Sequence, residues 1–257
     1  MRATKDLSAE MKKFRKLKNK SIEAKLLIRQ ASKIKNKFFI LLTPRIMIPL
    51  IVPAILTDNF STFKENLAKI NGHFSSVQID VIDGIFLPHQ TFSEREELKD
   101  VNSEAYFELH LMVQDPIAEI AKWAEVDSVT SVIFHIEADT DPKECIKNIR
   151  QHNWKAGIAL NPETPLAKVL PYADLVDEIL FLTVHPGQQG APFIPEVLEK
   201  IKEFKKLELN IICSADGGIN KNTIASVVSA GAEKLYVGGA IIQADDVEKA
   251  HEELTNI

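Results

Sequence analysis

The chain has 257 residues, enough for one large domain or two small domains of about 150 residues each. A net charge of -5 with 45% hydrophobic residues excludes a chain that is disordered over most of its length. The charge is unevenly divided: residues 1–47 hold 14 Lys and Arg against 3 Asp and Glu, a net of +11, which leaves -16 for residues 48–257. The acidic body argues against nucleic acid as its partner, because phosphate backbones are bound by clustered Lys and Arg.

The basic N-terminal extension, residues 1–47, is expected to be helical or disordered and to lie outside the main domain. Four interpretations are open. The extension is a tail without a catalytic role, a segment that binds an anionic surface such as RNA or membrane headgroups, or a targeting segment. In the fourth, translation starts at Met47 and the extension is not made.

From residue 48 the chain alternates short apolar, β-branched runs with helical segments. Eight strands are predicted, over residues 50–56, 76–82, 106–112, 131–137, 156–160, 178–184, 210–216 and 234–238. The intervening helices are predicted over residues 58–70, 116–125, 142–152, 195–206, 221–230 and 245–254. Asp58, Asp115 and Asn220 are the expected residues at the starts of three of them. A spacing of about 26 residues per strand predicts an α/β fold, a closed (β/α)8 TIM barrel over residues 48–257.

Two cysteines, Cys145 and Cys213, are too few for a disulfide framework and indicate a reducing, cytoplasmic setting. No run of about 18 uncharged apolar residues occurs, so no membrane span is predicted.

The predicted strands bring several polar residues to the carboxyl end of the barrel, where barrel enzymes hold their active sites. Asp80 on the second strand and Asp216 on the seventh are expected to face each other across the mouth. Two opposed carboxylates suit a reaction that removes a proton from one face of a carbon and returns one to the other. With His110 and Gln78 they also form a donor set for a divalent metal. The alternative for any single Asp is that it caps the following helix or turn.

Glycines follow three consecutive strands of the predicted barrel. They are Gly187 and Gly190, then Gly217 and Gly218, then Gly238 and Gly239. The loops after the last two strands are the usual phosphate site of this fold, where backbone N–H groups hold the anion. The pattern predicts a phosphorylated small molecule as ligand, and the alternative is that these glycines only form tight turns.

Several sequence blocks together resemble the ribulose-phosphate 3-epimerase family in order and spacing. They are VPAILTDNF (52–60), QIDVIDGIFLPHQTF (78–92), ELHLMVQDP (108–116), HIEA (135–138), GIALNPETP (157–165), LTVHPGQQGAPFIP (182–195), ADGGINKNTI (215–224) and AGAEKLYVGGAII (230–242). The resemblance implies an isomerase that interconverts ribulose 5-phosphate and xylulose 5-phosphate. It implies Asp80 and Asp216 as acid/base groups and, with His110, as ligands of a divalent metal such as Fe²⁺, Mn²⁺, Co²⁺ or Zn²⁺. Family members are often dimers or larger, so a homo-oligomer is among the states that it implies.

The chain departs from the family pattern at the metal and substrate positions. Gln78 stands where the family has His. Its amide oxygen can serve as a ligand but a weaker one than imidazole, so a harder ion, weaker metal affinity and no metal are all open. Ala54 and Gly239 each replace a Ser, and His185 replaces an Asn. Met112 is retained, and Ala54, Met112 and His185 are the predicted substrate pocket, while His135 is interpreted as a packing or hydrogen-bonding residue. These departures leave two alternatives open: a 3-epimerase of another ketose phosphate such as allulose 6-phosphate, and a barrel that binds a sugar phosphate without turnover.

Overall fold

The computed structural model describes residues 48–101, 103–187 and 190–256. The interpretations of residues 1–47, and the two glutamines at 188–189 in the loop after the sixth strand, lie outside the described residues. The domain boundary at residue 47 therefore stays a prediction.

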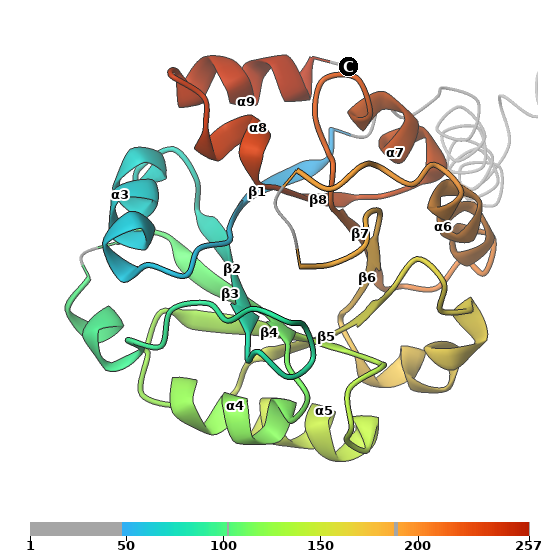
Figure 1. The fold of residues 1–257 in the computed structure, drawn as a ribbon. Coiled ribbons are helices and arrows are strands. Elements are labelled where there is room, and N and C mark those ends of the chain that lie inside the picture. The colour runs from blue at the N-terminus through green and yellow to red at the C-terminus, as the bar shows by residue number, and fades with distance from the viewer. Residues whose placement is uncertain (1–47, 102, 188–189, 257) are drawn as a thin grey trace, which may run out of the picture. The chain divides into compact units, whose positions relative to one another are not determined.

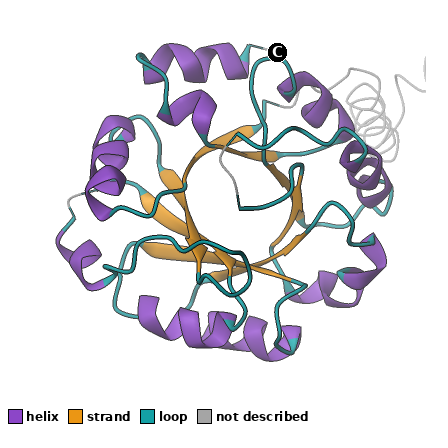
Figure 2. Cartoon of the chain, viewed as in Figure 1, coloured by secondary structure: helices purple, strands orange, loops and turns teal. Residues whose placement is uncertain are grey.

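The strands form one closed parallel barrel, paired in chain order, with β8 returning to β1 (Figure 1). The helices surround this barrel as an outer layer (Figure 2). The strands are β1 (Leu50–Ile55), β2 (Ser76–Ile82), β3 (Tyr106–Met112), β4 (Val129–His135), β5 (Lys155–Leu160), β6 (Glu178–Leu182), β7 (Ile212–Asp216) and β8 (Lys234–Val237). The helices are α3 (Phe60–Ile70), α4 (Pro116–Trp123), α5 (Pro142–Gln151), α6 (Val197–Lys205), α7 (Ile224–Ala230), α8 (Gly239–Ile242) and α9 (Val247–Thr255). The predicted (β/α)8 TIM barrel is confirmed.

Short 3₁₀ turns complete the outer layer, namely η1 (Glu96–Asp100), η2 (Leu166–Lys168) and η3 (Leu170–Leu175). The last two stand between β5 and β6, where no α-helix forms. Pro165 and Pro171 lie in this crossover, and proline disrupts the hydrogen-bond ladder of a longer helix.

Of the three residues predicted at helix starts, one caps its helix and two do not. The side chain of Asp115 accepts a hydrogen bond from the backbone N–H of Ala118, as a cap of α4 should. The expectation for Asp58 was wrong, because Asn59 caps α3 instead. Asn220 does not cap α7 either, since its side chain closes a local turn onto the N–H of Asn222.

The barrel has two apolar layers because every strand is buried on both faces. The larger layer packs the outward strand side chains against the helices. The smaller layer fills the lumen with the inward side chains of Val52, Ala54, Ile133, Ala159, Leu180, Leu182 and Tyr236. A filled lumen means that the strands form a rigid support for residues at their carboxyl ends.

A buried ionic cluster lies in the lumen toward the amino ends of β3, β6 and β8, on the side away from the mouth. Lys234 contacts Glu108 and also Glu178, whose Oε2 is 2.9 Å from the lysine Nζ. The hydroxyl of Tyr236 lies 2.7 Å from Glu108 Oε2 and 2.8 Å from Glu178 Oε1. Burial lowers the pKa of Lys234, but the two glutamates raise it by more than this, so the net shift is upward and the lysine is held as a cation. Charge and hydrogen bonds thus link β3, β6 and β8 across the lumen.

Both cysteines are free and buried, and burial raises the pKa of each thiol to about 12. Among the described residues, no helix combines the length and apolar character needed to cross a membrane.

We predict that Lys234→Met destabilises the barrel by about 3–5 kcal/mol, because Glu108 and Glu178 would keep buried charges without a cation. The melting temperature measured by calorimetry should fall by roughly 10 °C. The control is Lys202→Met, which removes an exposed pair with Glu199 and should cost at most about 1 kcal/mol. Equal, small effects of the two substitutions would contradict a structural role for the cluster.

Candidate active site

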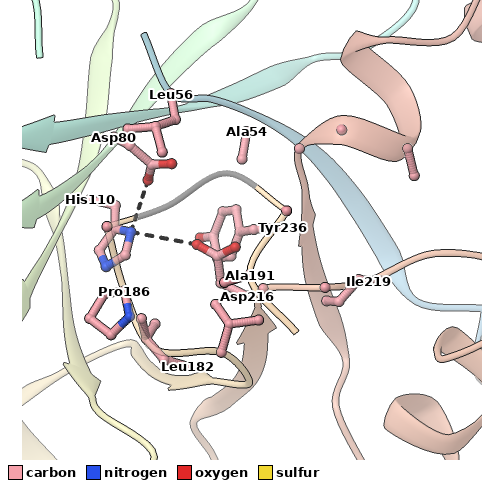
Figure 3. A pocket seen from close by; sticks show the side chains of 18 of the residues that line it. Ala54, Leu56, Asp80, His110, Leu182, Pro186, Ala191, Asp216, Ile219 and Tyr236 are labelled. Carbon is pink, nitrogen blue, oxygen red and sulfur yellow. Dashed lines mark hydrogen bonds and ion pairs between the residues drawn. The ribbon is translucent and has the colours of Figure 1, made fainter. Parts of the chain in front are cut away.

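A cavity of about 420 Å³ opens at the carboxyl ends of the strands (Figure 3). Most of the site residues predicted from the sequence line it. They are Ala54, Asp80, His110, Met112, Asp216, Gly187, Gly190, Gly217, Gly218, Gly238 and Gly239. Residues from β1, β2, β3, β7 and β8 therefore meet in one place, as a barrel with active-site loops at this end requires.

Asp80, His110 and Asp216 point toward one another in this cavity (Figure 3). The register between β2 and β3 places Asp80 directly beside His110, and Oδ1 of the aspartate is 2.9 Å from Nδ1 of the imidazole. Asp216 is the last residue of β7, and its Oδ2 is 3.5 Å from the same nitrogen. One imidazole nitrogen thus lies between two carboxylates.

Gln78 also lies between the two carboxylates, but through its nitrogen. Its amide Nε2 donates to Asp80 Oδ1 at 3.0 Å and to Asp216 Oδ2 at 2.8 Å. The side chain is buried beneath the cavity and does not line it. This arrangement differs from the expected oxygen ligand, because an –NH₂ group can give one proton to each of two like charges.

The carboxyl group of Asp216 holds its proton more tightly than an isolated one. Burial, and next the charge of Asp80, raise the pKa of Asp216 to about 7. Burial lowers the pKa of His110, but the hydrogen bond and charge of Asp80 outweigh it, so the net shift is upward. A cation or a proton is therefore needed to balance this cluster near neutral pH.

The side chains present fit a divalent cation. Asp80, His110 and Asp216 each offer one ligand atom, and these atoms lie within 4.8 Å of one another. Gln78 Oε1 is buried with no hydrogen-bond partner among the described residues. Turning the amide over would exchange Nε2 for Oε1 and complete a set of three oxygens and one nitrogen. Such a set suits a harder ion than a site with two imidazoles.

Two residues that the sequence did not place in the site extend it behind His110. Nε2 of His110 is 3.0 Å from Nε2 of His135, and Nδ1 of His135 is 3.1 Å from Oε2 of Glu137. The interpretation of His135 as a hydrogen-bonding residue is confirmed. Glu137 was expected on the fourth strand, but β4 ends at His135, and the turn that follows brings the carboxylate back to the ring.

Burial lowers the pKa of His135, with a smaller contribution from the charge of His110, so the ring is neutral. Burial raises the pKa of Glu137, but hydrogen bonds from His135, Thr164 and the backbone of Asn161 more than offset this, and the net shift is downward. A neutral imidazole therefore faces an ionised carboxylate.

His185 lies outside the cavity that the sequence assigned to it. Its side chain is 66% exposed and forms an ion pair with Glu163, Nδ1 to Oε1 at 3.1 Å. The next two residues, Pro186 and Gly187, are the ones that line the cavity. The chain turns at this point, so the imidazole points to solvent.

Gly217 shows why the loop after β7 needs glycine. Its φ is +110°, and a Cβ there would lie 2.4 Å from Cγ2 of Val184. A side chain is excluded on both counts. Gly239 is different, because a Cβ would meet nothing closer than Gln243 at 3.6 Å. The serine expected from the resemblance would therefore fit at this position.

A closed α/β barrel with a cavity at the carboxyl ends of its strands, lined by carboxylates and glycine-rich loops, has the architecture of the barrel enzymes. The model of the ribulose-phosphate 3-epimerase family matches residues 50–242. The chain belongs to that family, so the expected family and isomerase class are confirmed.

Relatives named ribulose-phosphate 3-epimerase align with nearly the whole body. The one from Mycobacterium bovis is 37% identical over 77% of this chain and 88% of its own length. That from Bacillus subtilis is 33% identical, over 79% and 97%. Among solved structures, the tryptophan synthase α-subunit of Pyrococcus furiosus has a TM-score of 0.61 at 15% identity, covering 81% of this chain and 98% of that one. A 3-hexulose-6-phosphate synthase has a TM-score of 0.58 at 17% identity, with the same coverage. These structures show the likeness of fold alone.

We predict that Asp216→Asn stabilises the metal-free protein more at pH 8 than at pH 5.5. The wild-type carboxyl has a pKa of about 7 when folded, against an ordinary value of 3.8. Its contribution to stability is therefore complete below about pH 4 and is lost as the pH rises through 7. Asparagine does not titrate and escapes this loss.

The measurement is the difference in melting temperature between variant and wild type, in EDTA, at the two pH values. The control is Asp139→Asn at an exposed position, for which the difference in melting temperature from wild type should be the same at both pH values. A constant difference for Asp216→Asn would contradict the raised pKa.

Proposed function

We propose that this protein is a ribulose-phosphate 3-epimerase that interconverts ribulose 5-phosphate and xylulose 5-phosphate. The observation that carries the proposal is the pair of carboxylates, Asp80 and Asp216, which converge from β2 and β7 on one cavity. Epimerisation needs one group to take a proton from a carbon and a second to return one from the other side. The names of the family and its relatives support the choice of substrate.

In the forward reaction one aspartate removes the C3 proton, and the electron pair of the C–H bond moves toward the C2 carbonyl oxygen. The other aspartate then gives a proton to C3 from the opposite face, so that no atom is gained or lost. When Asp80 begins as the base, Asp216 is the group on the opposite face that returns the proton. The roles exchange in the reverse direction.

Asp80, His110 and Asp216 would hold a divalent cation, with Gln78 as the fourth ligand through Oε1. When bound, such a cation supplies Lewis acidity that stabilises negative charge on the substrate oxygens during proton transfer. Fe²⁺, Mn²⁺, Co²⁺ and Zn²⁺ are the candidates. With such a cation bound, Gln78 would act as a ligand and no longer as a hydrogen-bond donor to the two carboxylates.

The substrate's phosphate would lie at the glycine loops after β6, β7 and β8. All six predicted glycines line the cavity, and neither Lys nor Arg is among the described residues that do so. Backbone N–H groups, together with the side-chain amides of Asn220 and Gln243, are then the available donors for the anion. This explains how a body with a net charge of -16 can accept a phosphate ester. Ala54 and Met112 form part of the apolar wall near the acid/base pair.

A cytoplasmic setting remains our expectation, and the two free, buried thiols support it. A homo-oligomer likewise remains an expectation from the family.

We predict that Asp80→Asn and Asp216→Asn each lower kcat by roughly 10²–10⁴-fold, because each removes one of the two proton-transferring groups. The assay follows conversion of ribulose 5-phosphate by the metal-loaded full chain, with Asp139→Asn as the control that keeps full activity. Lack of turnover by wild type on ribulose 5-phosphate would contradict the proposal. Turnover of allulose 6-phosphate would then favour the other ketose phosphate, and stabilisation by xylulose 5-phosphate alone would favour a binding protein.

We predict that Gln78→His strengthens Zn²⁺ or Co²⁺ binding by roughly ten- to a hundredfold. Imidazole is the better ligand for these ions, and the substitution removes the amide that bridges the carboxylates in the metal-free protein. The dissociation constant is measured by competition with a chelator. Gln114→His, outside the cavity, is the control. Unchanged affinity in Gln78→His would show that residue 78 does not touch the ion.

A further inference from the structure

Behind the metal-ligating face of His110 runs a chain of hydrogen bonds that ends on Glu137. The chain passes from Nε2 of His110 to Nε2 of His135 at 3.0 Å, and from Nδ1 of His135 to Oε2 of Glu137 at 3.1 Å. Both rings are buried, with side-chain exposures of 1% and 0%, and they stack with centroids 5.1 Å apart. The catalytic steps proposed above use neither His135 nor Glu137.

The far end of this chain has a fixed hydrogen-bond direction. Oε1 of Glu137 accepts from the backbone N–H of Asn161 at 2.9 Å and from the hydroxyl of Thr164. An ionised carboxylate can only accept, so the nitrogen that faces Oε2 must be an N–H group.

The donor and acceptor roles of the nitrogens on both rings follow from this. A neutral imidazole has one N–H and one acceptor nitrogen, so donation from Nδ1 makes Nε2 of His135 an acceptor. The nitrogen opposite it, Nε2 of His110, must therefore carry a proton. The remaining nitrogen of His110 is Nδ1, which lies between Asp80 and Asp216.

We propose that Glu137, acting through His135, fixes the tautomer of His110 so that Nδ1 is the nitrogen available to a divalent cation. Glu137 and His135 are positioning residues, since neither reaches the cavity. The inference rests on the metal-binding part of the proposed function. Metal-ligating histidines generally donate their other ring N–H to such a partner, and here that partner is a second histidine oriented by a carboxylate.

A lysine holds the segment that orients the carboxylate. Nζ of Lys200, on α6, lies 2.7 Å from the carbonyl oxygen of Pro162 and also contacts the carbonyls of Asn161 and Thr164. The two groups that donate to Glu137 are therefore tied to the outer helix layer. This anchoring holds the Asn161–Thr164 turn in place, so that the turn can orient Glu137 and thereby the protons on the two histidine rings.

Glu137→Gln tests the proposal with little change in shape. The donors from Asn161 and Thr164 require the glutamine oxygen at the Oε1 position, so the –NH₂ group takes the place of Oε2 opposite His135. The amide then donates to Nδ1 of His135, and the donor and acceptor of each hydrogen bond from Glu137 to His110 exchange. Nδ1 of His110 would be left with a proton, in competition with the cation.

The matched control is Glu163→Gln, which changes a glutamate between Asn161 and Thr164 whose partner is the exposed His185. The dissociation constant for Zn²⁺ is measured on the three full-length proteins by competition with a chelator. We expect Glu137→Gln to weaken binding by about 10–100-fold and Glu163→Gln to leave it within about twofold of wild type.

A second measurement reads the proton position directly. Long-range ¹H–¹⁵N spectra of the imidazole rings in Zn²⁺-loaded wild type distinguish Nδ1–H from Nε2–H. We expect Nδ1–H for His135 and Nε2–H for His110. In Glu137→Gln, His135 should change to Nε2–H, which a merely structural role for Glu137 would not produce.

Equal zinc affinity in wild type and Glu137→Gln would overturn this inference alone, as would an Nε2–H proton on His135 in wild type. Failure of wild type to bind zinc would overturn the metal site of the proposed function, and this inference with it.

Discussion

Two carboxylates forced close together by parallel strands are the feature on which the rest of this site depends. Asp80 and Asp216 project from β2 and β7 into one partly buried mouth, where their mutual repulsion must be balanced. Two neighbouring side chains, Gln78 and His110, reduce this repulsion. Gln78 gives a proton to each, His110 lies between them, and the pKa of Asp216 rises to about 7. In the proposed function this pair holds a cation and moves a proton.

The lumen below makes this arrangement rigid. Tyr236 lines the cavity with its ring, while its hydroxyl is bound between Glu108 and Glu178. Lys234 supplies the countercharge to both glutamates. Glu108 and His110 lie on the same strand face two residues apart, so β3 connects the ionic cluster to the site at the mouth. The site is thereby supported by a network that extends below it and, through His135 and Glu137, beside it.

The regular part of the structure follows from local sequence patterns, and the unexpected part follows from partners that are distant in the sequence. Repeated apolar runs at βα spacing were enough for the barrel, and strand-end polar residues were enough for Asp80, His110 and Asp216. The nitrogen of Gln78 facing two carboxylates depends on Asp216, 138 positions away. Glu137 needs the Asn161–Thr164 turn, and the exposure of His185 depends on how its loop turns. None of these contacts can be predicted from the hydrophobic periodicity of the sequence.

The most direct test of two-sided proton transfer is hydrogen exchange at C3 in D₂O, followed by NMR of both ketose phosphates. With wild type we predict one solvent deuterium at C3 of the product. Asp80→Asn and Asp216→Asn should each still exchange the C3 hydrogen of one epimer, a different one in each case, much faster than they form the other epimer. Epimerisation without solvent deuterium at C3, or at the wild-type rate by a variant that lacks either carboxylate, would contradict a mechanism that uses both.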